Sequence, residues 1–267
     1  MDLKLALICL LTFIIHLMGT LAYSVRIAGV RTRRIAVSFA LFNILVLVSR
    51  TSNSFQGPFL AKRVEANLSY SATHSLLSDF RWLMFSATLA TLVGAFLIPT
   101  CQRIFSVAVR DFQVHRSLPR LLLHVWYPNG LSALRKSLRV PAAGNVTAFR
   151  AGHGLTAGTI ALNIMAVALW TVGVFAALYA GYLNPDLRGT ASTLSPLVNG
   201  GATILMFVII DPQLSVMTDD VMEGRLEEPR FRRAIVWLVG SRCAGTLLAQ
   251  VLLLPAASLI VFVAQKL

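Results

Sequence analysis

The sequence predicts an all-α, polytopic integral membrane protein with about six transmembrane helices and one interfacial amphipathic helical segment. Three observations predict this class. Hydrophobic residues make up 56% of the chain. Charged residues make up only 13%, where a soluble domain carries roughly 25%. Several apolar runs also reach or approach the roughly 20 residues that a helix needs to cross a bilayer, and the mean hydropathy is +0.72.

The apolar runs divide one membrane domain, residues 1–267, into its helices. The first run ends at a cluster of arginines, and the second turns polar before it ends at Gly57-Pro58. If the second stays helical that far, Arg50 lies within the membrane. The sixth is too long for a simple vertical crossing, so we expect it to tilt or break. The predicted transmembrane segments are about 3–23, 35–58, 82–100, 158–183, 194–210 and 234–264.

The positive charges predict the orientation of the chain. The loops after the first, third and fifth segments hold 4, 8 and 4 Lys or Arg residues, and the opposite side holds seven. The positive-inside tendency therefore places these loops in the cytoplasm and both termini outside. Such loops also account for the net charge of +13 without a nucleic-acid partner. In the cytoplasmic region 101–157, arginines alternate with aromatic and aliphatic residues, which is typical of a helix lying on anionic membrane lipids.

Polar side chains inside the predicted helices are the candidate functional residues. Each costs free energy in hydrocarbon unless it faces the bundle interior. They recur at helical spacing in the first, second and sixth segments, and Asn199 adds one in the fifth, so we expect a hydrophilic cavity between these helices. The stripes are Thr12, His16 and Thr20; Asn43, Arg50 and Asn53; and Arg242, Thr246 and Gln250.

The arginines predict a phosphate ligand, because guanidinium presents a planar fork of donors that matches phosphate oxygens. We expect Arg26, Arg50 and Arg242, with Asn53, to bind a phosphate-bearing lipid headgroup. His16, Asn43, Asn199, Thr246 and Gln250 would line the cavity. Other interpretations stay open: Arg242 could extend toward the cytoplasm, and Asp211 could form a local pair. The remaining alternatives are packing roles for His16, Asn43, Asn163 and Asn199, and membrane anchoring for Arg31, Arg33 and Arg34.

No motif in the chain indicates an enzyme. There is no paired-acid motif, no nucleophile with a recognisable base and no spacing typical of metal ligands, so we expect neither a metal nor a cofactor. Arg225, Arg230, Arg232 and Arg233 lie among or directly after the acids Asp219, Asp220, Glu223, Glu227 and Glu228, which favours a self-neutralising loop over a magnesium site. No ATP-binding motif is present.

Two long strings resemble the Amj family, the bacterial lipid II flippases that act as an alternative to MurJ. The first is TLAYSVRIAGVRTRRIAVSFALFN, followed by VLVSRTSNSFQGPFL. The second is RGTASTLSPLVNGGATILMFVIIDPQLSVMTDDVMEGR. The resemblance implies a transporter in the bacterial cytoplasmic membrane that serves peptidoglycan biosynthesis. Its substrate would be lipid II, a disaccharide-pentapeptide on undecaprenyl pyrophosphate, moved from the inner to the outer leaflet.

The residues suggest how such a transporter would work. Arg26 would meet the pyrophosphate at the cytoplasmic entrance, Arg50 would meet it nearer the outer side, and Arg242 would complete the positive cavity. An ion gradient, the membrane potential or the gradient of the lipid itself would drive transport, with His16 and Asp211 as possible proton-coupling groups. Two alternatives differ in class: a membrane-embedded enzyme acting on a polyprenyl pyrophosphate, and a non-catalytic scaffold of the cell envelope.

Overall fold

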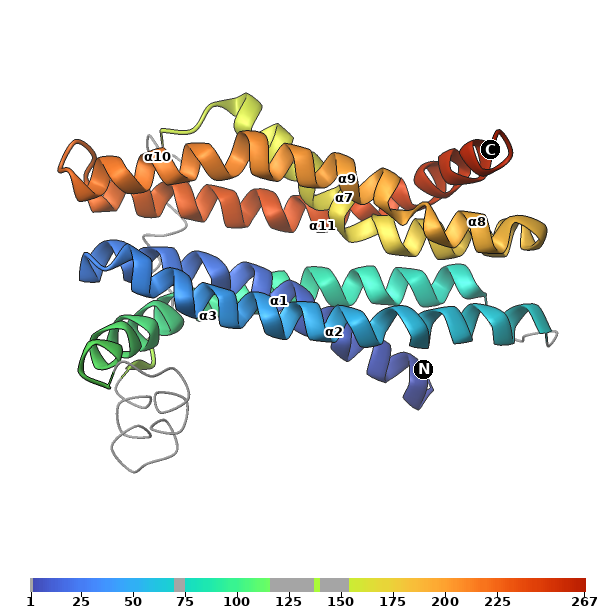
Figure 1. Cartoon of the computed structure of the whole chain (residues 1–267), viewed down its shortest axis with the longest axis horizontal. Helices are drawn as coiled ribbons and strands as arrows, with labels where there is room; N and C mark the ends of the chain where they lie inside the picture. Colours follow the sequence, from blue (N-terminus) through green and yellow to red (C-terminus); the bar gives the residue numbers. More distant parts are fainter. Residues whose placement is uncertain (1, 70–74, 116–136, 140–153) are drawn as a thin grey trace.

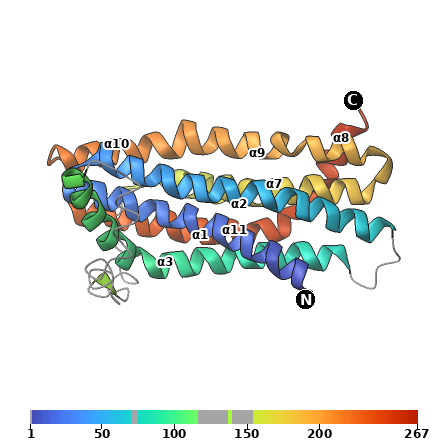
Figure 2. The same cartoon turned by 60° about the horizontal axis from the view of Figure 1, so that its bottom comes forward.

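The computed structural model describes residues 2–69, 75–115, 137–139 and 154–267, and every regular element in these ranges is helical. Six stretches are long and apolar enough to cross a membrane, which confirms the predicted class of a multi-pass helical membrane protein. Figures 1 and 2 show the long helices running side by side along the long axis of the molecule. The six stretches are Leu3–Thr32, Ile35–Ser69, Leu76–Phe112, Ala157–Leu183, Pro185–Met222 and Glu228–Ala264.

The helices form two groups. In the N-terminal group, α1 (Leu3–Thr32) packs along both α2 (Ile35–Ser69) and α3 (Leu76–His115). In the C-terminal group, α7 (Ala157–Leu183) packs along α11 (Glu228–Ala264). Figure 1 shows the two groups one above the other, with both termini toward the same end of the bundle. We call the opposite end, where α1 turns into α2, the arginine end.

The turn between α1 and α2 lies further along the chain than the hydropathy predicts. Helix α1 continues past residue 23 to Thr32, where Arg33 adopts a left-handed conformation (φ 54°) and the amide of Arg34 donates to the carbonyl of Gly29. A side chain at Gly29 would overlap the Ser38 hydroxyl, so the glycine lets α2 pass close to α1. Arg26 therefore belongs to a helix instead of a loop.

Helices α2 and α3 also extend beyond their predicted segments. Pro58 does not end α2, which continues to Ser69, and α3 continues through Pro99 to His115. Hydropathy detects the apolar part of a helix and misses polar turns at its ends, which is why the predicted boundaries fall short. Figure 1 shows the green end of α3 turning away from its teal part, as a proline kink does. Its apolar residue Val109 packs against Val25 and Leu41. Most of the predicted interfacial region, 116–136 and 140–153, lies outside the described residues.

The fifth membrane stretch is built from several short helices. It begins with η2 (Pro185–Leu187) and α8 (Arg188–Thr193), and continues with α9 (Ser195–Ile204), η3 (Leu205–Ile210) and α10 (Asp211–Met222). The η3 turn is a π-helix that directly precedes the Asp211-Pro212 pair. Proline clashes with the carbonyl four residues earlier, and a wider turn relieves that clash. The breakers in this segment thus distort the helix without ending it, and Asp211 begins α10.

An ion network at the terminal end holds α1, α2 and α3 together. The Arg63 guanidinium donates to Asp79 (2.7 Å) and to Asp2 (2.8 Å), and Asp79 is only 5% exposed. The hydrogen bond from Arg63 also lowers the pKa of the Asp2 carboxyl below its usual range. The Asp2 carboxylate in addition caps α1 by accepting from the amide of Leu5.

Removal of Arg63 is expected to destabilise the N-terminal group. The variant Arg63→Ala leaves the buried Asp79 carboxylate unpaired, which typically costs roughly 3–5 kcal/mol. Thermal unfolding of the purified protein in detergent measures this loss. The neighbouring Lys62 is exposed, so Lys62→Ala is the matched control and should unfold like the parent. The double variant Arg63→Ala/Asp79→Asn should recover most of the stability, and no recovery would contradict the unpaired charge as the cause.

Candidate functional site

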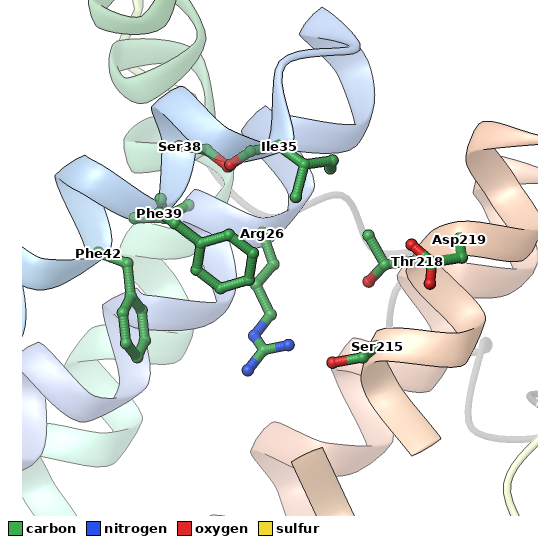
Figure 3. Close-up of a pocket in the computed structure, with 9 residues that line it drawn as sticks. Arg26, Ile35, Ser38, Phe39, Phe42, Ser215, Thr218 and Asp219 are labelled. Atoms are coloured by element: carbon green, nitrogen blue, oxygen red, sulfur yellow. The ribbon is translucent and has the colours of Figure 1, made fainter. Parts of the chain in front are cut away.

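Arg26 forms an ion pair between the two groups of helices. It lies on α1, and its Nη2 is 3.0 Å from Oδ1 of Asp211, the first residue of α10. The Arg26 side chain is 13% exposed, and the ring of Phe39 lies 5.9 Å from the guanidinium carbon, in the range of a cation–π contact. Figure 3 shows Arg26 pointing into the space between α1 and α10, with the Phe39 ring beside it.

A small amphipathic cavity of about 50 Å³ opens beside this pair. Apolar side chains of α1 and α2 form one side, and hydroxyl and carboxylate groups of α10 form the other (Figure 3). Such a surface offers the Arg26 cation and the Ser215 hydroxyl to a phosphate group, and apolar contacts to its lipid. The cavity is lined by Val25, Arg26, Ile35, Ser38, Phe39, Phe42, Ser215, Thr218 and Asp219.

Arg242 lies deeper, in the core between α11 and α1. It is 7% exposed, its Nε has no hydrogen-bond partner, and its guanidinium interacts with the Tyr23 hydroxyl. A side chain at Gly19 would overlap Arg242 Nη2, so the glycine makes room for the guanidinium. In the part of the chain that the structure describes, no carboxylate lies within ion-pair distance of Arg242. A buried cation without a counterion is costly in a membrane, and an anionic ligand would offset that cost.

The arginine sites are connected along one face of α1. Gly19, Tyr23 and Arg26 follow each other at helical spacing, and His16 precedes them by one turn. Tyr23 interacts electrostatically with Arg242, Arg26 and Asp211. This face of α1 therefore joins the Arg26 cavity to the buried Arg242.

The position of Arg242 does not support the alternative in which it extends to the membrane edge. The residue lies fourteen positions after Glu228, about 21 Å along α11 at 1.5 Å per residue. Its guanidinium turns sideways toward Gly19 instead of along the helix to the arginine end.

Of the residues predicted to line the cavity, His16 lies near Arg242 in the structure. His16 is 4% exposed, its Nδ1 has no partner, and Arg242 is close enough to act on it electrostatically. The other polar residues of α11 make helix contacts: the Thr246 hydroxyl donates to the carbonyl of Cys243, and Gln250 donates to the carbonyl of Arg81.

The polar stripe of α2 shares one face, as the spacing predicts, but that face points outward. Asn43, Arg50 and Asn53 are all exposed, whereas Ser52 and Gln56 face α1, where Gln56 donates to the Thr12 hydroxyl. Arg50 lies fifteen positions after Ile35, about 22 Å along α2. It is thus at mid-helix, but its role in headgroup binding stays a prediction.

Asn199 and Asn163 lie at helix interfaces. Asn199 of α9 packs against Gly173 of α7, and its buried Oδ1 has no partner. Asn163 of α7 donates to the carbonyl of Leu238 and to the Ser241 hydroxyl on α11. These contacts fit the packing alternative for both residues.

Sequence reasoning missed several partners at the site. Arg31, interpreted as an anchor, pairs with Glu228 of α11 at 2.6 Å, which adds a second ion pair between the two groups of helices. Glu228 and Asp211 are 197 and 185 positions from their arginines, so no local spacing could have revealed these pairs. The contacts of Tyr23 and Phe39 with arginines were also not predicted, because aromatic residues are common in apolar helices.

Six stretches long and apolar enough to cross a membrane, with the buried guanidinium of Arg242 between α1 and α11, define a multi-pass helical membrane protein. No cluster of metal ligands occurs among the residues described. The chain belongs to the Amj family, described as "Alternate to MurJ", which matches residues 11–264. The protein named Lipid II flippase Amj from Bacillus subtilis (strain 168) is 35% identical over 252 residues, covering 91% of this chain and 90% of that protein. No solved structure matches the chain.

Proposed function

We propose that this protein is a lipid II flippase, which moves the undecaprenyl-pyrophosphate-linked peptidoglycan precursor from the inner to the outer leaflet of the bacterial cytoplasmic membrane. The observation that carries the proposal is the 35% identity to a named lipid II flippase over nine tenths of both chains. The chemistry of the site is compatible, because a diphosphate needs cations, and one face of α1 connects the partly exposed Arg26 to the buried Arg242.

The arginine end is the cytoplasmic end in this proposal, and both termini are extracytoplasmic. The positive-inside tendency supports that orientation, because the arginines at the ends of α1 and α3 and around the start of α11 gather there. The Arg26 cavity would then meet lipid II in the leaflet where it is made.

Transport begins with an exchange of anions at Arg26. The pyrophosphate replaces the Asp211 carboxylate, which frees α10 from α1. A cavity of about 50 Å³ cannot hold the disaccharide-pentapeptide, so α2 and α10 must separate to admit the headgroup. Arg242 then attracts the pyrophosphate inward past Tyr23, and Arg50 with Asn53 receives it nearer the outer side.

Proton coupling would act through His16 and Asp211. His16 lies against Arg242, and Asp211 pairs with Arg26, so a proton on either group changes the net charge that surrounds an arginine. Protonated Asp211 would release Arg26 to the pyrophosphate, and protonated His16 would strengthen the attraction for an anion beside Arg242.

Vesicles that contain only this protein test the function. Labelled lipid II is placed in both leaflets, and its accessibility to a membrane-impermeant quencher is followed over time. We expect complete quenching in vesicles with protein and half quenching in empty vesicles. Equal quenching in both would contradict the proposal. Phosphate release from undecaprenyl pyrophosphate in the same preparation would instead favour the enzyme.

Arg50 is tested in cells in which this protein is the only lipid II flippase. The variant Arg50→Ala removes an exposed charged contact worth up to about 1 kcal/mol, so we expect transport to fall by up to about fivefold and growth to slow. Lys62→Ala removes one exposed charge from the same helix and should support normal growth. Normal growth of the Arg50 variant at normal protein levels would remove Arg50 from the mechanism.

A further inference from the structure

We propose that the arginine end carries a second phosphate site, separate from the Arg26 cavity, which binds the phosphate of an anionic phospholipid headgroup. A cavity of about 630 Å³ lies between the end of α1 and the kinked end of α3. Three arginines and three hydroxyl groups line it: Arg31, Arg103 and Arg110, with Thr32, Ser106 and Ser137.

The fold holds these groups in place from three separate segments. Arg31 and Thr32 end α1, while Arg103 and Arg110 lie beyond the Pro99 kink on α3, two helical turns apart. Residues 137–139 are fixed to α3, because the Thr100 hydroxyl bonds both the amide and the carbonyl of Arg139 at 3.0 Å. Ser137 is thereby held at the cavity and is only 7% exposed.

The arginines keep donors free for a ligand. The Arg31 Nε is engaged by Glu228 at 2.6 Å, and the Arg110 Nε donates to the Ser106 carbonyl at 3.2 Å. Neither bond uses the terminal nitrogens, which are the atoms that grip phosphate in a fork geometry. None of the described residues that line this cavity is acidic, so three like charges converge there, and Glu228 neutralises part of the charge on Arg31.

The location selects a lipid headgroup over a free ion. The apolar residues of the same part of α3, Phe105 and Val109, pack toward Val25 and Leu41, so its basic face is held at the edge of the apolar bundle. Arg103 and Arg110 follow the apolar part of α3, predicted at 82–100, which places them at the membrane edge, at the level where lipid phosphates lie. A volume of about 630 Å³ is also far larger than phosphate alone and leaves room for the substituent of a phosphodiester.

Native mass spectrometry of the full chain in detergent measures the binding. Phosphatidylglycerol is the probe, and phosphatidylcholine and inorganic phosphate are the comparisons. The double variant Arg103→Gln/Arg110→Gln should bind phosphatidylglycerol roughly tenfold more weakly, since it loses two charged contacts. The control Arg225→Gln/Arg230→Gln removes two exposed charges, one from the loop before α11 and one from its first turn, and should bind like the parent. The single variant Arg103→Gln should lose part of the affinity and covers the case in which the double variant misfolds.

The outcomes separate the possible ligands. Equal losses in the site and control variants would overturn the proposal, because binding would then follow net charge alone. Inorganic phosphate that binds as tightly as phosphatidylglycerol would overturn the assignment to a lipid headgroup. No lipid II is present in the assay, so its result is independent of the proposed transport activity.

Discussion

The variant Arg242→Gln is expected to lose transport by roughly thirtyfold or more, because truncating a buried charged contact typically costs roughly 2–5 kcal/mol. The same variant should unfold at the same temperature as the parent, or higher. The guanidinium is 7% exposed, and no carboxylate among the described residues pairs with it. Burial of this charge therefore opposes folding, and an uncharged amide relieves that cost. Quenching of labelled lipid II in vesicles measures transport, and thermal unfolding in detergent measures stability.

The opposite directions of the two readouts make this prediction specific. If Arg242 only supported packing between α11 and α1, its replacement would lower stability and transport together. The control Arg225→Gln removes one charge from an exposed loop residue and should leave both quantities unchanged. Full transport by the Arg242 variant at normal protein levels would exclude the residue from headgroup binding.

The class of fold could be predicted because it depends on composition and hydropathy, and both can be read directly from the sequence. The helix ends could not be predicted, because they depend on local contacts that hydropathy does not report. Helix α1 continues to Thr32 because a left-handed residue and the close approach of Gly29 to Ser38 set its turn. Helix α2 passes Pro58 because its last turns pack into the core through Leu60 and Val64.

The candidate site was predicted in its residue types more than in its geometry. The buried arginine on α11 and the histidine on α1 were expected from their presence in apolar helices, and the structure brings them together. The face of α1 that joins Gly19, Tyr23 and Arg26 was readable in principle from helical spacing, but a glycine and a tyrosine carry no charge to mark it. The partners of Arg26 and Arg31 depend on tertiary packing across most of the chain.

Two ion pairs at the arginine end join the two groups of helices. Arg26–Asp211 and Arg31–Glu228 both join α1 to the C-terminal group. The hydrophobic cluster of Tyr23, Ile27, Leu214 and Phe231 joins the same helices. Any headgroup that enters beside Arg26 must compete with the Asp211 carboxylate for the same guanidinium. The proposed function therefore requires this pair to exchange one anion for another.

If the anions exchange at Arg26, replacement of Arg26 and replacement of Asp211 should change the binding of undecaprenyl pyrophosphate in opposite directions. The variant Arg26→Ala should weaken binding of undecaprenyl pyrophosphate to the purified protein by about fivefold, since a partly exposed charged contact contributes up to about 1 kcal/mol. The variant Asp211→Asn removes the competing carboxylate and leaves Arg26 free, so binding should strengthen by about the same factor. Both variants should lose a similar, small amount of thermal stability, because each breaks the same pair.

The directions of these changes in binding distinguish an anion exchange at Arg26 from an ion pair that is purely structural. A pair that only fastens α1 to α10 would lose binding with either substitution, and that result would contradict the exchange. Glu228→Gln is the matched control, because it breaks the neighbouring pair of Arg31 at the same end without freeing Arg26. Its binding of undecaprenyl pyrophosphate should match the parent. If Glu228→Gln strengthened binding as much as Asp211→Asn, the gain would come from loosening the arginine end, and Arg26 would not be the group that the diphosphate meets first.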